Sequence, residues 1–262
     1  MSRFAPLFSG SSGNCTYVGC GDSGILIDAG VSAKRILAAL ADVGVAADSI
    51  RALFVTHEHA DHIAGVKTLC SRLRIPLYAS WGTLSALSDA DILNDKFTAS
   101  VITGNGAEVA GMHVLSFATS HDARESCGYM IETPDGRRIA ICTDLGYVSP
   151  HVRAALTGCD LCLLESNHDV MMLQNGPYPY ALKRRILGQC GHMSNASCAD
   201  ELPGLLQSGT TRFVLGHLSR ENNYPELAEA TAAAALTEAG AQRDVDYVLT
   251  VAPQAGGTML LL

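Results

Sequence analysis

The side chains best suited to chemistry lie in one short stretch, His57–His62, which has the pattern H-x-H-x-D-H and follows the apolar run 52–55. It supplies three imidazoles and a carboxylate, at His57, His59, Asp61 and His62. Neutral imidazole and carboxylate are ligands that suit Zn, Mn or Fe. A solvated polar turn is disfavoured, because neighbouring charged histidines repel one another unless a cation or another partner compensates. The stretch therefore predicts a metal site.

The spacing within this stretch indicates how the ligands divide. Where a chain leaves a strand in extended form, side chains two positions apart point to the same side, so His57 and His59 can bind one ion together. Asp61 and His62 lie past the expected bend and face a neighbouring position. The spacing favours two adjacent metal positions.

Other polar side chains follow apolar, strand-like runs further along the chain. Asp28, His121, Asp144, Glu165 and His217 each stand just after the end of such a run. Rigid scaffolds commonly present ligands from strand ends. Because an unpaired buried carboxylate is costly, the position of Asp144 indicates a cationic partner. For Asp28 two interpretations remain open. It could form a hydrogen bond to the backbone of the stretch His57–His62, which we name the metal loop, or its role could be confined to its own turn.

The elements that must position these residues alternate between strand-like and helical patterns. We expect strands over 3–8, 15–18, 24–27, 51–55, 76–79, 112–118, 127–132, 138–142, 161–164, 212–215, 247–251 and 258–262. We expect helices over 32–42, from the metal loop to about 73, and over 81–87, 180–188, 196–206 and 225–239. This alternation predicts an α/β chain.

The composition is that of an ordinary globular protein, with 48% hydrophobic and 17% charged residues in a chain of 262. That length is sufficient for a large core, and we expect a single domain over 1–262. The apolar runs are too short to span a membrane, and an export signal is not evident. We therefore expect a cytoplasmic protein that does not bind membranes.

The cysteine count supports the same compartment. Nine cysteines is an odd number, and in a long chain it favours reduced thiols over a disulfide framework. Cys159 and Cys162 form a single C-x-x-C pair without a second pair at zinc-finger spacing. Small buried hydrophobic residues are the favoured interpretation, and any further role of the pair stays open.

The charge limits the choice of partners. A formal net charge of −8 disfavours a broadly basic surface of the kind that wraps nucleic acid. A phosphate substrate is still compatible, because divalent cations would supply positive charge at the site itself. Lys183–Arg185 and Arg137–Arg138 are small basic clusters that could assist, although such clusters are more often solvated faces.

Taken in order, the candidate ligands resemble the five motifs of the metallo-β-lactamase superfamily over almost the whole chain. These residues are Asp28, His57, His59, Asp61, His62, His121, Asp144 and His217. Four further stretches resemble the WalJ/YycJ-like group of 5′-to-3′ exonucleases, which is related to RNase Z. They are Gly10–Asn14, Glu165–Asp169, Gly191–Asn195 and Leu215–Asn223. The resemblance implies an αββα sandwich of two mixed sheets flanked by helices.

The resemblance also implies two divalent metal ions, Zn or Mn, with Fe a further option. By this resemblance His57, His59 and His121 would hold one ion. Asp61, His62 and His217 would hold the second, with Asp144 bridging the two. Two such ions would bind a bridging hydroxide and neutralise charge on a phosphodiester under attack.

Resemblance to RNase Z extends to two catalytic candidates. His192 would protonate the leaving oxygen and Glu165 would hold or tune it, while Asp61 would orient the hydroxide. The alternative for His192 is a histidine at a helix start that bonds to the backbone. His168 is an outer-shell candidate with a purely structural alternative. Candidate phosphate contacts are Asn14, Ser219 and Asn222.

We therefore predict a metal-dependent phosphodiesterase or nuclease, of the 5′-to-3′ exonuclease type, with nucleic acid as substrate. The alternative is a thioester or lactone hydrolase on the same metal core. A diiron redox module is disfavoured because its relatives typically carry Glu where this chain has His59. The sequence leaves open the metal, the choice among DNA, RNA and a small phosphodiester, exo against endo cleavage, and a homo-oligomer.

Overall fold

The computed structural model describes residues 1–262 and contains two sheets of seven strands each. Their strand orders are β14-β1-β2-β3-β4-β5-β6 and β13-β12-β11-β10-β9-β8-β7. Both sheets combine parallel and antiparallel neighbours, so both are mixed. The chain divides into two compact units, unit 1 (Met1–Ser116, Ala123–Arg137 and Pro253–Leu262) and unit 2 (Phe117–Asp122 and Arg138–Ala252).

The strands of the first sheet come from both ends of the chain. They are β1 (Ser2–Phe8), β2 (Cys15–Cys20), β3 (Ser23–Ile27), β4 (Ile50–Phe54), β5 (Leu77–Ala79), β6 (Ala99–Val101) and β14 (Leu260–Leu261). The strands of the second sheet are β7 (Ala107–Val109), β8 (Met112–Ala118), β9 (Cys127–Glu132), β10 (Arg138–Cys142), β11 (Leu161–Glu165), β12 (Arg212–Gly216) and β13 (Val248–Val251).

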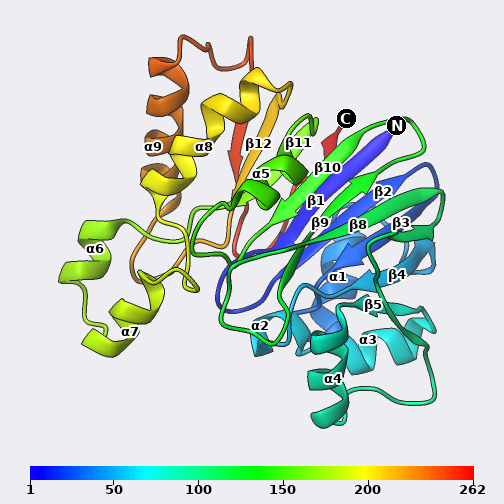
Figure 1. Ribbon diagram of the computed structural model, residues 1–262. Coiled ribbons are helices and arrows are strands. Elements are labelled where there is room, and N and C mark those ends of the chain that lie inside the picture. The colour runs from blue at the N-terminus through cyan, green and yellow to red at the C-terminus, as the bar shows by residue number, and fades with distance from the viewer. The chain divides into compact units, whose positions relative to one another are not determined.

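The helices lie between strands in sequence, as the alternating pattern predicts (Figure 1). They are α1 (Ala33–Asp42), the 3₁₀ turn η1 (Ala47–Ser49), α2 (Ala60–Ile63), α3 (Val66–Leu73), α4 (Trp81–Asp89), α5 (Pro150–Leu156), α6 (Val170–Asn175), α7 (Tyr180–Ile186), α8 (Asn195–Gln207) and α9 (Pro225–Glu238). None of these helices combines the length and the apolar composition needed to cross a membrane.

In unit 1 the strands that carry the metal loop are parallel. β3 pairs with β4, and β4 pairs with β5, all in the same direction. Helix α1 buries Ile36 and Leu40, which are spaced to lie on one face, in a core that also contains Leu53 of β4 and Leu69 of α3. The carboxyl ends of β3 and β4 therefore share one edge, where Asp28 and the metal loop follow them.

Unit 2 repeats this arrangement with longer parallel pairing. Strands β10, β11, β12 and β13 are all parallel, and α8 and α9 lie side by side along them (Figure 1). Asp144, Glu165 and His217 stand at the carboxyl ends of β10, β11 and β12. Parallel pairing thus brings side chains from three distant parts of the sequence to one edge of unit 2.

The single helix expected between the metal loop and residue 73 is two helices, and this expectation was wrong. Helix α2 ends at Ile63 and α3 starts at Val66, with Gly65 between them. The amide of Gly65 donates to Ala29 O at 2.7 Å, and a Cβ on this residue would lie 2.2 Å from Val31 O. Only glycine allows that approach, which fastens the metal loop to the loop after β3.

Most of the expected strands and helices are confirmed within a few residues, but the sequence patterns missed five short elements. These are η1, β6, β7, α5 and α6. Each has only three to seven residues, too few for a periodic pattern to stand out. The strand expected over 258–262 is present only as β14, which is two residues long.

Candidate metal centre

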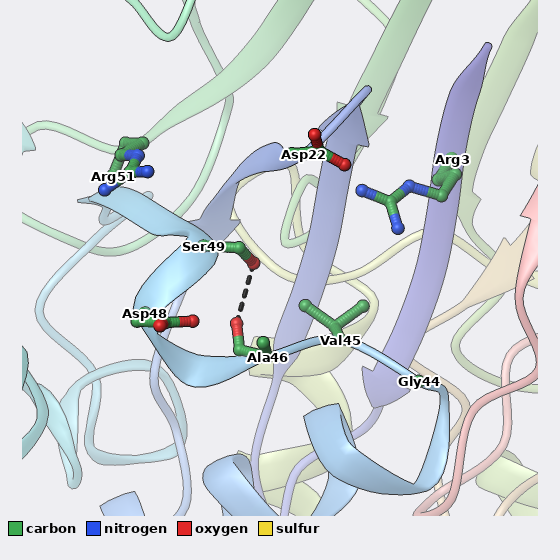
Figure 2. A pocket seen from close by; sticks show the side chains of 8 residues that line it. All are labelled: Arg3, Asp22, Gly44, Val45, Ala46, Asp48, Ser49 and Arg51. Carbon is green, nitrogen blue, oxygen red and sulfur yellow. Dashed lines mark hydrogen bonds between the residues drawn. The ribbon is translucent and has the colours of Figure 1, made fainter.

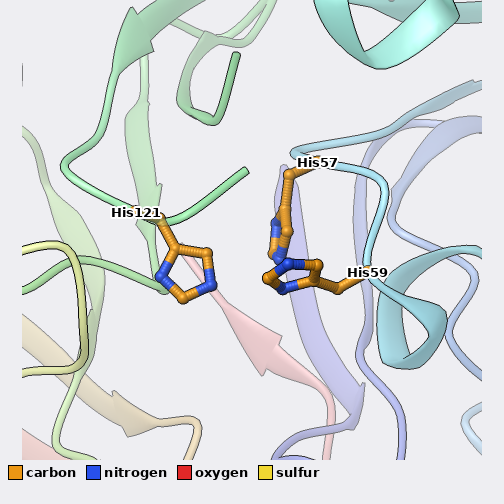
Figure 3. Close-up of side chains that lie close together, drawn as sticks. All are labelled: His57, His59 and His121. Atoms are coloured by element: carbon orange, nitrogen blue, oxygen red, sulfur yellow. The ribbon is translucent and has the colours of Figure 1, made fainter. Parts of the chain in front are cut away.

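The metal loop of unit 1 buries two of its three histidines completely. His57 and His62 are both 0% exposed, whereas His59 and Asp61 are half-buried. The His57 ring lies edge to face with that of His59, with centroids 4.6 Å apart, and 4.1 Å from the His62 ring. Figure 3 shows this edge-to-face pair on the loop after β4; the third labelled side chain, His121, belongs to unit 2.

The Asp28 side chain forms hydrogen bonds with this loop. Its carboxylate accepts hydrogen bonds from Thr56 N at 2.8 Å and from Thr56 Oγ1 at 3.0 and 3.1 Å. It also accepts one from His62 Nδ1 at 2.8 Å. Asp28 adopts φ 63°, a left-handed conformation that is costly outside glycine. The carboxylate therefore fixes both the loop backbone and one imidazole.

Asn14, a candidate phosphate contact, is 7% exposed and serves the same loop. Its backbone N–H donates to Asp61 O at 2.8 Å, and its side-chain Oδ1 accepts from the backbone N–H of Gly10 at 2.9 Å. Its Nδ2 lies 3.0 Å from His62 Nε2. These contacts give Asn14 a structural role beside Asp61 and His62.

Glu165 of unit 2 is 0% exposed, and its carboxylate forms hydrogen bonds with several neighbouring groups. Its Oε1 lies 2.7 Å from His217 Nδ1 and 2.9 Å from His192 Nδ1, while Oε2 accepts the amide N–H groups of Leu145 and Met193, each at 3.1 Å. Burial alone would raise the pKa of this carboxyl group, but the charges and hydrogen bonds of His192 and His217 outweigh burial and hold the pKa at about 2. Glu165 is therefore a buried anion.

Asp144 lies beside His192 and His217 and is 2% exposed. Its Oδ1 is 3.5 Å from His217 Nε2, 3.7 Å from His192 Nδ1 and 3.8 Å from His121 Nε2. Asp144, Glu165, His192 and His217 each offer a ligand atom within 4.8 Å of the others. Unit 2 thus gathers carboxylates and imidazoles at the spacing of a metal site.

His121 is held in the same unit by Gly191, whose carbonyl oxygen lies 3.1 Å from Nδ1. Burial lowers the pKa of His121, so its neutral form, which is the form that binds metal, is favoured.

Four of the buried histidines, His57, His62, His121 and His217, share an arrangement that fits metal binding. In each, Nδ1 faces a fixed oxygen, which orients the ring and leaves Nε2 as the nitrogen for an ion. The partners are Thr56 Oγ1 for His57 at 3.0 Å, Asp28 Oδ2 for His62 at 2.8 Å, Gly191 O for His121 at 3.1 Å and Glu165 Oε1 for His217 at 2.7 Å. Together with the carboxylates, this donor set suits Zn, Mn or Fe. The residues therefore fit a divalent cation.

Backbone strain marks the same positions. Asp28, Asp144 and His217 have φ of 63°, 59° and 56°, in the left-handed region that glycine favours. Such conformations persist only where the surroundings impose them, and they cluster at functional sites.

His168, the outer-shell candidate, is 1% exposed, and neither of its ring nitrogens has a hydrogen-bond partner. Burial lowers its pKa to about 4. It is absent from the groups of side chains that could share an ion. Its backbone pairs with Ser194, so the residue links the loop after β11 to the start of α8.

The loops of unit 2 are joined by a network of asparagines that sequence analysis missed. Asn223 Nδ2 donates to Asn195 Oδ1 at 2.8 Å and to Ser166 O at 2.9 Å, and Asn167 Nδ2 donates to His217 O at 2.8 Å. The sequence signal was that these asparagines lie in the stretches Glu165–Asp169, Gly191–Asn195 and Leu215–Asn223, but nothing in those stretches indicated which side chains would bond.

Two further candidate phosphate contacts lie beside this network and are buried. Ser219 is 8% exposed and Asn222 is 0% exposed. Ser219 Oγ accepts the Asn222 amide N–H at 3.2 Å. Their burial favours a structural role in the loop after β12, and contact with a substrate stays a prediction for both.

Cys159 and Cys162 are both 0% exposed, as the interpretation of small buried hydrophobic residues requires. All nine cysteines of the chain are free.

A hollow of about 390 Å³ in unit 1 lies away from these residues (Figure 2). Arg51 near the start of β4 lines it, whereas the metal loop follows the other end of that strand. Ser49 Oγ donates to Ala46 O at 2.7 Å on its wall. Two basic residues, Arg3 and Arg51, and two acidic residues, Asp22 and Asp48, line it, so the charges balance and no anion is favoured.

Fold and ligand geometry define a metallo-β-lactamase-type hydrolase. The chain belongs to the β-lactamase superfamily, because the family described as "Beta-lactamase superfamily domain" matches residues 24–218. The members of this superfamily are metal-dependent hydrolases, as the donor set independently indicates.

Two curated relatives cover nearly all of the chain. It is 37% identical over 241 residues to exodeoxyribonuclease YycJ of Bacillus anthracis, and this alignment covers 91% of this chain and 90% of that protein. It is 36% identical over 248 residues to exodeoxyribonuclease WalJ of Streptococcus pneumoniae, which spans 94% of this chain and 92% of that protein.

Solved structures agree on the fold. The metallo-β-lactamase fold protein YhfI from Bacillus subtilis aligns over the whole of both chains with a TM-score of 0.73 at 14% identity. Zn²⁺-bound PqqB from Methylobacterium extorquens aligns over the whole of both chains with a TM-score of 0.70 at 19% identity. The predicted fold class, two mixed sheets flanked by helices, is confirmed.

Proposed function

We propose that this protein is a metal-dependent 5′-to-3′ exodeoxyribonuclease. The observation that carries the proposal is the contact of His192 with Glu165, which adds a proton donor to a superfamily ligand set. Esters with good leaving groups need little help from an acid, whereas a phosphodiester with an alkoxide leaving group needs much. The names of the two curated relatives support DNA as the substrate.

For the metal centre we propose the assignment that the superfamily motifs imply. His57, His59 and His121 would hold one divalent cation, and Asp61, His62 and His217 the other, with Asp144 between them. All seven residues belong to groups of side chains that could hold an ion. When bound, two such ions would activate water and neutralise charge on the phosphate.

The remaining steps fall to the side chains of the chain itself. We assign Asp61 to orient the attacking water as it approaches phosphorus. The bond from phosphorus to the 3′ oxygen breaks, and His192 Nε2 donates a proton to that oxygen. Glu165 bonds Nδ1 of His192 at 2.9 Å, so the ring presents Nε2 to the substrate.

Within unit 2, exposure supports this division of roles. The side chain of His192 is 14% exposed, whereas those of His121 and His217 are 1% and 2% exposed. A proton donor must reach the substrate, while a ligand need only reach the ion.

We also infer that residues 1–262 form one domain. Unit 1 is built from three separate segments and unit 2 from two, and the family match from 24 to 218 runs through both.

The free cysteines support a cytoplasmic location, because thiols persist in reducing compartments. Light scattering against the 27.5 kDa mass of one chain tests whether the protein is a homo-oligomer.

The test is an assay of the purified protein with Mn²⁺ or Zn²⁺ on 5′-phosphorylated DNA. We expect mononucleotides to accumulate from the 5′ end, and the Asp144→Asn variant and a chelator each to abolish them. The same oligonucleotide as RNA, and a circular DNA without ends, measure the preference for DNA and for ends. Absence of cleavage of every nucleic acid and of bis-p-nitrophenyl phosphate would refute the proposal.

A further inference from the structure

Residues 170–191 of unit 2, which we name the α6–α7 segment, have an unusual charge for this protein. They contain Lys183, Arg184 and Arg185 but no Asp or Glu, in a chain with 26 acidic and 18 basic residues. The segment is therefore a local region of positive charge on an acidic protein. Such a region attracts anions and raises their local concentration.

Two of the three cations fix the segment itself. Lys183 Nζ donates to Gln174 O at 2.8 Å and to Gly176 O at 2.7 Å, which ties α7 to the end of α6. Arg185 pairs with Asp122, with Nη2 2.8 Å from Oδ1. These contacts hold α7 against the residue that follows His121.

The third cation, Arg184, is exposed and pairs with a ring in place of a carboxylate. Its guanidinium carbon lies 5.9 Å from the centroid of Tyr180. Tyr180 is 76% exposed, although an aromatic side chain stabilises a fold mainly when it is buried. A cation over an exposed aromatic ring offers one group to a phosphate and one face to a base.

Other large apolar side chains of the segment are also exposed. Met171 is 63% exposed and Leu187 is 45% exposed. Tyr224, at the start of α9, is 48% exposed. Asn222, two positions before it, accepts at its carbonyl oxygen the backbone N–H of Asp169, the residue just before the segment, at 2.8 Å. Nucleic-acid strands bind surfaces that combine positive charge with aromatic rings.

Both ends of the segment lead to the proposed catalytic pair of unit 2, Glu165 and His192. Helix α6 follows the loop after Glu165 directly, and Asp169 caps it by accepting the Met172 amide N–H at 2.8 Å. After α7 the chain passes Gly191 and reaches His192, whose amide N–H donates to Ile186 O at 3.0 Å. Figure 1 shows α6 and α7 extending away from β11 and β12. A strand lying on α7 would thus point its end toward His192.

We propose that the α6–α7 segment is the surface on which single-stranded DNA lies as its 5′ end enters the metal centre, an inference that rests on the proposed function. Arg184 contacts a backbone phosphate and Tyr180 stacks on a base. DNA is favoured over a protein partner because the segment lacks carboxylates, whereas protein interfaces usually mix both charges. Stacking tolerates every base, as an exonuclease that degrades any sequence requires.

The test measures binding apart from cleavage. Affinity for a fluorescent single-stranded oligonucleotide is titrated with EDTA present, at several salt concentrations. Arg184→Glu is expected to weaken binding roughly tenfold and to reduce the slope of log affinity against log salt by about 0.7 to 1. Tyr180→Ala is expected to weaken binding by roughly 5-fold to 100-fold, and Tyr180→Phe to retain wild-type affinity because it keeps the ring.

The matched control is Arg72→Glu. Arg72 is exposed and lies in the last turn of α3, as Arg184 does in the last turn of α7, so both variants change the charge equally at equivalent helix positions. If Arg184→Glu and Tyr180→Ala bind the oligonucleotide as tightly as Arg72→Glu does, the surface is not a DNA site. The surface is also not a DNA site if these two variants keep their affinity for DNA but lose affinity for anionic lipid vesicles or for a protein.

Cleavage assays distinguish failure of this inference from failure of the proposed function on which it rests. If the wild-type protein cleaves neither DNA nor bis-p-nitrophenyl phosphate, the proposed function fails. If it cleaves DNA and the two variants keep the wild-type KM, only the surface fails. The expected result is a higher KM for DNA, and a lower ratio of kcat/KM on DNA to kcat/KM on the small ester.

Discussion

Oε1 of Glu165 lies 2.7 Å from Nδ1 of His217, a bond between two fully buried groups. The same oxygen lies 2.9 Å from Nδ1 of His192, so one carboxylate orients both a proposed metal ligand and the proposed proton donor. Asp28 has the corresponding role in unit 1, where it bonds His62 and the loop that carries it. Each unit therefore has its own buried carboxylate behind its imidazoles.

Replacing Glu165 with Gln keeps the shape of the side chain and removes its charge. We expect kcat on DNA to fall by roughly 10-fold to 100-fold, because the partners of metal ligands and proton donors typically have effects of this size. KM should change less, since Glu165 is too deep to touch the substrate. Steady-state kinetics with metal analysis measure both effects. Glu132→Gln, at an exposed position, is the control and should match the wild type.

The variant His192→Ala distinguishes the nuclease from the alternative thioester or lactone hydrolase. We expect cleavage of DNA to fall by roughly 100-fold to 10,000-fold, the usual contribution of an acid catalyst. Hydrolysis of a thioester should change little, because its leaving group needs no proton. Metal content should stay at the wild-type value, since His192 lies outside the proposed ligand set. Loss of bound metal from this variant would instead identify His192 as a ligand.

Much of the fold followed from the sequence because the parallel strands carry local signals. An apolar run followed at once by Asp144 is visible in the sequence, and parallel pairing of β10 with β11 then brings it to the same edge as Glu165. Packing constraints gave no such signal. The break before α3 depends on the approach of Gly65 to Val31 O, a contact 34 positions away in the chain that no local pattern records.

The candidate site was predictable where chemistry is carried by residue type, and less so where it depends on burial. Histidines in the pattern H-x-H-x-D-H indicate a metal whatever surrounds them. Asn222, in contrast, resembles a surface residue until the structure shows it to be 0% exposed. Likewise, the bond between Asn195 and Asn223 joins residues 28 positions apart, and asparagine has no periodic pattern that would predict it.

Asp28→Ala should destabilise the protein as well as its metal centre. The change leaves the Thr56 amide and His62 Nδ1 without their buried acceptor, and it places alanine at φ 63°. We expect the free energy of unfolding to fall by about 3 to 5 kcal/mol. Asp28→Asn should cost about 1 to 2 kcal/mol, because asparagine tolerates this φ and keeps an acceptor oxygen.

Urea denaturation with a chelator present measures these differences without contributions from bound metal. Asp42→Ala, at an exposed position at the end of α1, is the matched control and should lie within about 0.5 kcal/mol of the wild type. Equal stability of Asp28→Ala and Asp42→Ala would contradict the role of Asp28 in holding the loop.

His168 should make the stability of the protein depend on pH. Burial lowers its pKa in the folded state to about 4, from 6.5 in the unfolded chain. Between these values the unfolded chain binds a proton that the folded protein does not, so the histidine's contribution is complete above pH 6.5 and is lost as the pH falls toward 4. The loss amounts to about 3 kcal/mol. Chemical denaturation of the metal-free protein at a series of pH values should show a decline of at least this size, because buried His121 also has a lowered pKa, and His168→Asn should reduce the decline by about 3 kcal/mol. The same replacement at exposed His151 should leave the decline unchanged, and a His168→Asn variant that declines as steeply as the wild type would place the acid sensitivity elsewhere.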